Sequence, residues 1–223
     1  MHPSDNRTIW ILCAALLAAL CAAPQAVHAQ HYGLDLDRDT LNQTVLIHPP
    51  IDASGARFSL STREHTYRSQ LRLGDQLARD FTLMRVGSDG IPRAYEPGTA
   101  GKENEDWFGW RQDVLAPFDG TVTRIEAPDT ANTPGAMNRE AQPGLIFFET
   151  DEGTTVIYVH VREIEVEEGQ RVRTGAVVAK VGNNATSRAP HVHVGAWKDE
   201  TPLQIQVDLY AAERSGTDAE NND

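Results

Sequence analysis

Three histidines in the C-terminal half of the sequence could act together in one chemical step. His191 and His193 lie in an apolar, β-branched stretch that predicts a β-strand. Residues two apart in a strand point to the same face, so both imidazoles would enter the same space. His160 ends another apolar run, and Gly-rich turns separate the two runs. Neutral imidazole is the commonest protein ligand of zinc and also moves protons near neutral pH, so these residues predict hydrolytic metal chemistry.

Short strands separated by turn residues would position these histidines. Apolar and β-branched runs predict strands at 44–48, 56–61, 77–86, 113–116, 120–127, 144–150, 154–161, 176–181 and 189–197. No stretch predicts a convincing helix, so we expect an all-β fold with an antiparallel, sandwich-like core. Two long polar loops interrupt this core, at 87–106 and 128–143. They are either walls of a substrate groove or solvated insertions.

The first residues have the three parts of a secretory signal peptide. Arg7 precedes the apolar run 9–23, and a small-residue cleavage site ends at Ala29. We therefore expect a periplasmic or secreted protein with no membrane span in the mature chain. Both cysteines, Cys13 and Cys21, lie in this segment, and a bulky residue precedes Cys21 where a lipid-attachment site has a small one. The mature chain would form neither a disulfide nor a thiolate metal site.

The overall charge narrows the class of partner. The 223 residues carry a formal net charge of −12. Nucleic-acid-binding proteins usually carry a basic patch, so this balance argues against a nucleic-acid partner.

A series of short motifs occurs in a fixed order along the chain. The motifs are V-L-A-P-F-D-G-T-V at 114–122, Y-V-H at 158–160, V-E-E-G-Q-R-V-R-T-G at 166–175 and P-H-V-H at 190–193. As a set they resemble the lysostaphin-like (LytM-type) zinc metallopeptidases, which cut peptide bonds of bacterial peptidoglycan. The resemblance covers roughly residues 80–197 and implies a duplicated-hybrid-motif-like β fold, a Zn²⁺ cofactor and peptidoglycan peptides as substrate.

Together with the signal-peptide pattern and the composition of the termini, the resemblance predicts four parts of the chain. These are a signal peptide at 1–29, an N-terminal extension at 30–55, a LytM-like peptidase domain at 56–210 and a disordered acidic tail at 211–223.

The family's site residues can be carried over position by position. Its metal is held by the His and the Asp of an H-x-x-x-D element and by the second His of H-x-H. The Y-x-H histidine and the first His of H-x-H serve catalysis. The resemblance therefore implies that Asp80 and His193 bind zinc and that His160 and His191 are catalytic. The chain departs from the pattern at Gln76, which stands four residues before Asp80 in place of the family's histidine.

His65 is our substitute for the missing ligand. A hairpin turning near 72–75 would lay position 65 roughly opposite Asp80, so the imidazole could reach the same metal. His48 is a weaker candidate, because two prolines follow it and indicate an exposed bend. Three protein ligands, His65, Asp80 and His193, would leave a fourth zinc position for water.

Two other functions stay open. The missing histidine is compatible with a metal-poor LytM-like domain that binds cell wall or regulates another cell-wall hydrolase. The D-G-x-V and G-x-x-V-x-x-G elements also resemble half-motifs of biotinyl and lipoyl carrier barrels. Such carriers present a lysine at a hairpin tip, whereas Lys180 lies within an apolar strand.

Several further residues have two readings. Trp107, Phe108 and Trp110 either form a substrate wall or, as is commoner for such aromatics, pack over a sheet edge. Asn183 and Asn184 most simply make a turn between two strands, and a catalytic part for them is disfavoured.

Overall fold

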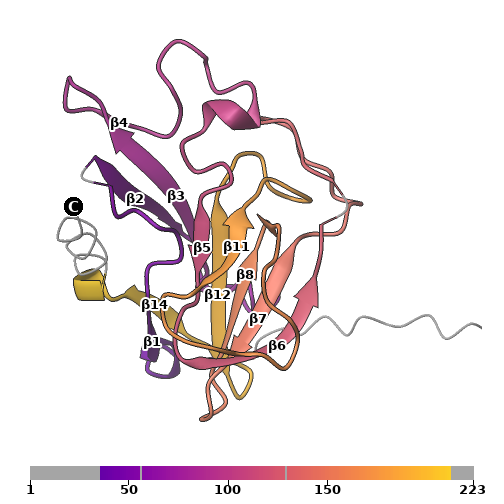
Figure 1. Ribbon diagram of the computed structural model, residues 1–223. Coiled ribbons are helices and arrows are strands. Elements are labelled where there is room, and N and C mark those ends of the chain that lie inside the picture. The colour runs from indigo at the N-terminus through magenta and orange to yellow at the C-terminus, as the bar shows by residue number, and fades with distance from the viewer. Residues whose placement is uncertain (1–35, 56, 129, 212–223) are drawn as a thin grey trace, which may run out of the picture. The chain divides into compact units, whose positions relative to one another are not determined.

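The computed structural model describes residues 36–55, 57–128 and 130–211 and has an all-β fold (Figure 1). Helical structure in these residues is limited to single turns: η1 (Thr40–Asn42), η2 (Asn104–Asp106) and a turn at 209–211. The predicted all-β class is therefore confirmed. The expected signal peptide and residues 212–223 of the expected tail lie outside the described residues.

The largest sheet in the described residues has nine strands, all antiparallel to their neighbours. Seven follow the order β10 (Arg171–Val172), β6 (Gly120–Glu126), β7 (Leu145–Glu149), β8 (Thr155–Val159), β12 (Val192–Lys198), β3 (Arg79–Val86) and β2 (Phe58–Glu64). Two short strands extend it, because β4 (Pro92–Arg93) pairs with β3 and β13 (Thr201–Pro202) pairs with β12.

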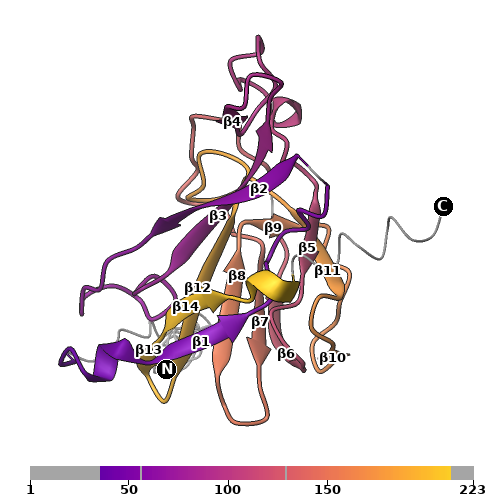
Figure 2. The ribbon, with the colours of Figure 1, turned by 90° about the vertical axis from the view of Figure 1, so that its left-hand side faces the viewer.

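Two smaller sheets complete the described fold. One joins β5 (Asp113–Leu115), β11 (Val177–Val181) and β9 (Val161–Arg162), all antiparallel. The other is a parallel pair, β1 (Thr44–Ile47) beside β14 (Gln204–Val207), which Figure 2 shows. Residues 44–47, which the sequence places in an N-terminal extension, are thus hydrogen-bonded to residues near the end of the expected peptidase domain.

One apolar core joins the large sheet to the three-stranded sheet. Alternate residues of the large sheet, such as Val122, Val156 and Val194, are fully buried, and so are Val114 and Val181 of the smaller sheet. This is the pattern of strands with one face against another layer, and burial of each such side chain contributes about 1.5–3 kcal/mol. The sandwich-like core holds β8, β12 and β3 side by side, and these strands position the histidines.

The strand predictions agree with the structure within a few residues. The prediction missed β14 and the two-residue strands, which are too short for a periodic signal. It was also wrong about the start of the last predicted strand. Pairing of β12 with β3 begins at Val192, opposite Phe81, so His191 precedes the strand.

Candidate metal centre

Asp80 lies in the middle of three adjacent strands. It pairs with Arg63 of β2 on one side and with His193 of β12 on the other. Side chains directly opposite one another across antiparallel strands share a face, so His193 is brought to Asp80 by register alone.

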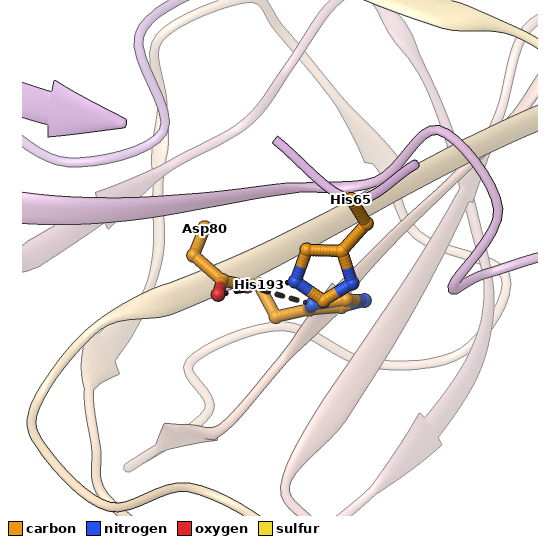
Figure 3. A group of neighbouring side chains, drawn as sticks. All are labelled: His65, Asp80 and His193. Carbon is orange, nitrogen blue, oxygen red and sulfur yellow. Dashed lines mark hydrogen bonds and ion pairs between the residues drawn. The ribbon is translucent and has the colours of Figure 1, made fainter. Parts of the chain in front are cut away.

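His65 reaches the same place from the segment that follows β2. Its backbone N–H donates to Ala78 O at 2.7 Å, which places His65 diagonally from Asp80. His65 therefore lies two residues beyond Arg63, which is the residue opposite Asp80. Diagonal neighbours on antiparallel strands remain within reach of an aromatic side chain. Figure 3 shows the three side chains pointing toward one another.

We call His65, Asp80 and His193 the ligand group. One possible ligand atom of each lies within 4.8 Å of the others. His65 Nε2 is 3.1 Å from Asp80 Oδ2, and His193 Nδ1 is 2.9 Å from Asp80 Oδ1. Zinc ligands 2.0–2.2 Å from a tetrahedral ion lie roughly 3.3–3.5 Å apart, and two imidazoles with one carboxylate are a common catalytic donor set. The donors present therefore fit a zinc ion.

Asp80 is held in its ionised form. Burial on its own would raise the pKa of this carboxyl. Hydrogen bonds from His193 and His65, together with positive charge on the neighbouring histidines, outweigh that effect and keep the pKa well below its usual range. A charged carboxylate is the form that binds a metal.

The Gly74 carbonyl orients the His193 ring. His193 Nε2 donates to Gly74 O at 2.9 Å, which leaves Nδ1 facing Asp80. The carbonyl comes this close because Gly195 has no side chain, since a Cβ there would lie 2.2 Å from Gly74 O. A second hydrogen bond of this kind sets the tautomer of a metal-binding histidine. His193 Nδ1 is therefore the nitrogen that a metal would bind, once it releases the proton that it donates to Asp80.

Gln76 does not replace the family's histidine. Its side chain is fully buried, and Nε2 lies 3.0, 3.2 and 2.9 Å from the carbonyl oxygens of Arg68, Ser69 and Leu71. Gln76 therefore braces the loop between β2 and β3, which carries His65 and Gly74.

His48 lies outside the ligand group. Its Nδ1 contacts Pro49 O at 3.0 Å, and its ring packs against Gly175. Its side chain is buried, so the expected exposed bend is not what the structure has.

His160 and His191 stand beside the ligand group. Their ring centroids are 4.9 Å apart, and the His160 ring is 6.2 Å from that of His193. His191 Nε2 lies 3.7 Å from Asp80 Oδ1. The structure thus brings together all five residues that the sequence nominates.

Backbone carbonyls set the tautomers of these two histidines. His160 Nδ1 donates to Asn184 O at 3.0 Å, and His191 Nδ1 donates to Ala189 O at 2.8 Å. A carbonyl only accepts, so each ring keeps an unprotonated Nε2 when it is neutral. Burial is the main cause that lowers the pKa of both rings, and the positive charge of Arg63 lowers that of His191 further. Both are therefore neutral bases near pH 7.

The backbone at His160 has an unusual conformation. Its φ is 68°, in the left-handed region. Asn184 Nδ2 donates to His160 O at 3.2 Å and to Val161 O at 3.0 Å, and a Cβ on Gly182 would lie 2.4 Å from His160 O. Such backbone conformations occur at functional sites when the surroundings hold them in place. The turn predicted at Asn184 does not indicate that its side chain holds the backbone carbonyls of His160 and Val161.

Asparagines link both long loops to the segment that carries His191. Asn132 Nδ2 donates to Ala185 O at 2.9 Å and to Ser187 O at 2.8 Å. Asn104 Nδ2 donates to Asn132 O at 2.7 Å, and Asn183 Nδ2 donates to Asn104 Oδ1 at 2.9 Å. The loops at 87–106 and 128–143 are thus hydrogen-bonded to the loop that precedes β12. No residue pattern in the sequence indicates these contacts, which join positions 28 to 79 residues apart.

The aromatic cluster makes local contacts. Trp107 Nε1 donates to Gly101 O at 3.0 Å, Phe108 lies 4.0 Å below the Arg85 guanidinium and Trp110 lies 4.6 Å below that of Arg162. These contacts favour the packing role for the three aromatics.

Lys180 lies within β11 rather than at a hairpin tip. It forms ion pairs with Asp113 and Glu165. This position does not match that of a carrier lysine.

The model of peptidase family M23 matches residues 108–205, a segment that contains His160, His191 and His193, and this confirms the resemblance seen in the motifs. No curated protein matches the chain.

Solved structures similar to this chain include peptidases and a pore-forming complex. The catalytic domain of lysostaphin from Staphylococcus simulans has 16% identity, covers 65% of this chain and 87% of its own, and has a TM-score of 0.40. A mutant catalytic domain of the prophage-encoded M23 protein EnpA from Enterococcus faecalis has 15% identity and a TM-score of 0.40. The match covers 65% of this chain and 84% of the EnpA chain. A chain of the SpoIIQ–SpoIIIAH pore-forming complex has 19% identity and a TM-score of 0.42. The match covers 72% of this chain and 87% of that chain.

Proposed function

We propose that the protein is a zinc endopeptidase that hydrolyses peptide bonds of bacterial peptidoglycan, and the match of residues 108–205 to the model of peptidase family M23 supports this proposal. The observation that carries this proposal is the juxtaposition of the ligand group with His160 and His191. In this proposal His65, Asp80 and His193 hold the zinc ion.

Zinc in such a site would polarise the scissile carbonyl and lower the pKa of a bound water to about 7. His160 and His191 supply the proton transfers. Each presents a basic Nε2, because its Nδ1–H is held by a backbone carbonyl. One ring can take a proton from the attacking water and return it to the leaving amine. Loss of such a group costs about 10²- to 10⁴-fold in rate.

We place this activity outside the cytoplasm. The signal-peptide pattern at 1–29 supports secretion to the periplasm or beyond. Among the described residues, no helix has the length and apolar character needed to cross a membrane.

A second candidate is a metal-poor LytM-like domain that binds cell wall or regulates another hydrolase. Two observations favour it. Gln76, which stands where the family has a histidine, is fully buried and engaged with backbone carbonyls. Arg63 Nη2 lies 2.6 Å from Asp80 Oδ2, where it competes with a cation for that oxygen.

The zinc content of the purified full chain separates the two candidates. We expect about one zinc per chain by elemental analysis after dialysis, lost in His65→Gln and in Asp80→Asn. His48→Gln is the matched control, because it removes an imidazole outside the ligand group, and it should keep its zinc. The zinc-loaded chain should then release peptides from purified peptidoglycan, identified by mass spectrometry. A chain that binds no zinc after loading and releases no peptides would support the second candidate.

A further inference from the structure

Arg63 reaches the ligand group from solvent. It is the cross-strand partner of Asp80 in the β2–β3 hairpin, so both side chains lie on the same face. Its Nε and Nη2 are 3.0 and 2.6 Å from Asp80 Oδ2. The Arg63 side chain is 77% exposed, whereas that of Asp80 is 9% exposed. The guanidinium therefore lies at the entrance to the site, with its outer N–H groups open to a ligand.

The charge of Arg63 has few partners. Within the described part of the chain, Asp80 provides its one ion pair. The next residue, Glu64, points to the other face of the strand and pairs with Arg79 at 3.3 Å. A cation next to the catalytic histidines is notable in a chain whose net charge is −12.

A metal on Asp80 would change what Arg63 binds. A divalent cation would take up the negative charge of Asp80 and weaken the attraction of this carboxylate for the guanidinium. The planar guanidinium fork then offers paired N–H donors of the geometry that suits another carboxylate. That carboxylate would sit beside the scissile bond, because Asp80 belongs to the ligand group.

We propose that Arg63 binds a carboxylate of the substrate next to the scissile bond, so that the site selects acidic peptides. This inference rests on the proposed function, because it specifies the class of peptide cleaved. The competing role for Arg63 is to hold Asp80 and nothing else. In that case its removal affects all substrates alike.

Binding measurements separate these roles. The probe is a preparation of cross-linked muropeptides with free carboxylates, compared with the same preparation after carbodiimide amidation. Affinity is measured by titration calorimetry on the zinc-loaded full chain carrying His160→Gln, which slows turnover. Charge-assisted hydrogen bonds of an exposed arginine lead us to expect about 10- to 100-fold tighter binding of the carboxylate form.

Variants test whether this preference belongs to Arg63. Arg63→Met should abolish the preference while zinc content stays unchanged, and Arg63→Lys should keep part of it because a lysine lacks the paired donors. Arg173→Met is the matched control, since Arg173 is exposed and follows β10 at the opposite edge of the sheet.

Two results would overturn the proposal. One is equal binding, or no binding, of both forms by the parent protein. The other is an equal loss for both forms in Arg63→Met. The proposed peptidase activity is decided separately, by zinc content and by peptide release from peptidoglycan by the chain without the His160→Gln change.

Discussion

His160 and Asn184 hold each other through reciprocal hydrogen bonds. The His160 ring donates from Nδ1 to Asn184 O at 3.0 Å, and Asn184 Nδ2 donates to His160 O at 3.2 Å. The first bond sets the tautomer of the ring and the second holds its backbone in the left-handed region. Asn184, which the sequence places in a turn, thus fixes both the backbone conformation and the tautomer of a proposed catalytic base.

Asn184→Ala should lower activity without changing metal binding, because Asn184 supports His160 and is not a metal ligand. It leaves the carbonyls of residues 160 and 161 and the Gly144 N–H without their buried partner. We expect unfolding in urea to show a loss of about 2–4 kcal/mol. Peptide release should fall while zinc content is unchanged. The exposed Asn138→Ala is the control and should be near neutral. Full activity in Asn184→Ala would show that His160 needs no such support.

Gly195→Ala should weaken metal binding without touching a ligand. The added Cβ would lie 2.2 Å from Gly74 O and must push away the carbonyl that orients His193. We expect zinc affinity, measured by competition with a chelator, to fall about 10- to 100-fold, as it does when an outer partner of a metal ligand is lost. Gly109→Ala is the matched control, because its Cβ would meet Leu83 Cβ at an ordinary 3.5 Å. Unchanged affinity in Gly195→Ala would contradict this role for Gly74.

Gln76→His should not restore the family's metal ligand. The buried side chain at this position points toward the carbonyls of the β2–β3 loop, and the amide donors that satisfy them would be lost. We expect a loss of about 2–4 kcal/mol in the free energy of unfolding. Zinc content should not rise above that of the parent. A stable variant with tighter zinc binding would mean that the loop can turn position 76 toward the metal.

Burial of His160 should make the stability of the metal-free protein depend on pH. Its pKa in the folded state is lowered well below 6.5, chiefly by desolvation. Below about pH 6.5 the unfolded chain takes up a proton that the folded protein refuses, so stability falls as pH falls, by at most about 1.4 kcal/mol per pH unit. His193 has a raised pKa and works in the opposite sense.

Urea unfolding in a chelating buffer from pH 5 to pH 8 tests this linkage. The difference between the parent and His160→Gln isolates the contribution of His160, because the other histidines are common to both. The parent should lose more stability than the variant on acidification. Parallel curves would show that His160 accepts a proton without cost in the folded state.

Much of the fold could be predicted from the sequence, because runs of β-branched residues between turn residues mark strands individually. The register in which the strands pair is harder to predict from the sequence. The hairpin that carries His65 was expected in the right place, but its register differs by two residues because the loop is folded around the buried Gln76 amide. That amide contacts carbonyls five to eight positions earlier, a pattern with no sequence signature.

The histidines of the site could be found because their residue type is distinctive, and Asp80 could be found through the family resemblance. The residues that support them could not be found in either way. His193 stands out as a histidine in an apolar run, whereas Gly195 and Asn184 look like ordinary strand and turn residues. Their roles depend on close contacts with backbone from distant parts of the chain. The assignment of roles to His65, Asp80, His160, His191 and His193 stays a prediction for the experiments above.

The asparagine contacts between the loops at 87–106, 128–143 and 182–190 have a consequence for how this scaffold can diversify. Loops that act singly can be lengthened, shortened or grafted one at a time. Here a change of length in one loop would shift the others and, through Ser187 and Ala189, the ring of His191. A loop graft that is designed to change specificity should therefore transfer all three segments together.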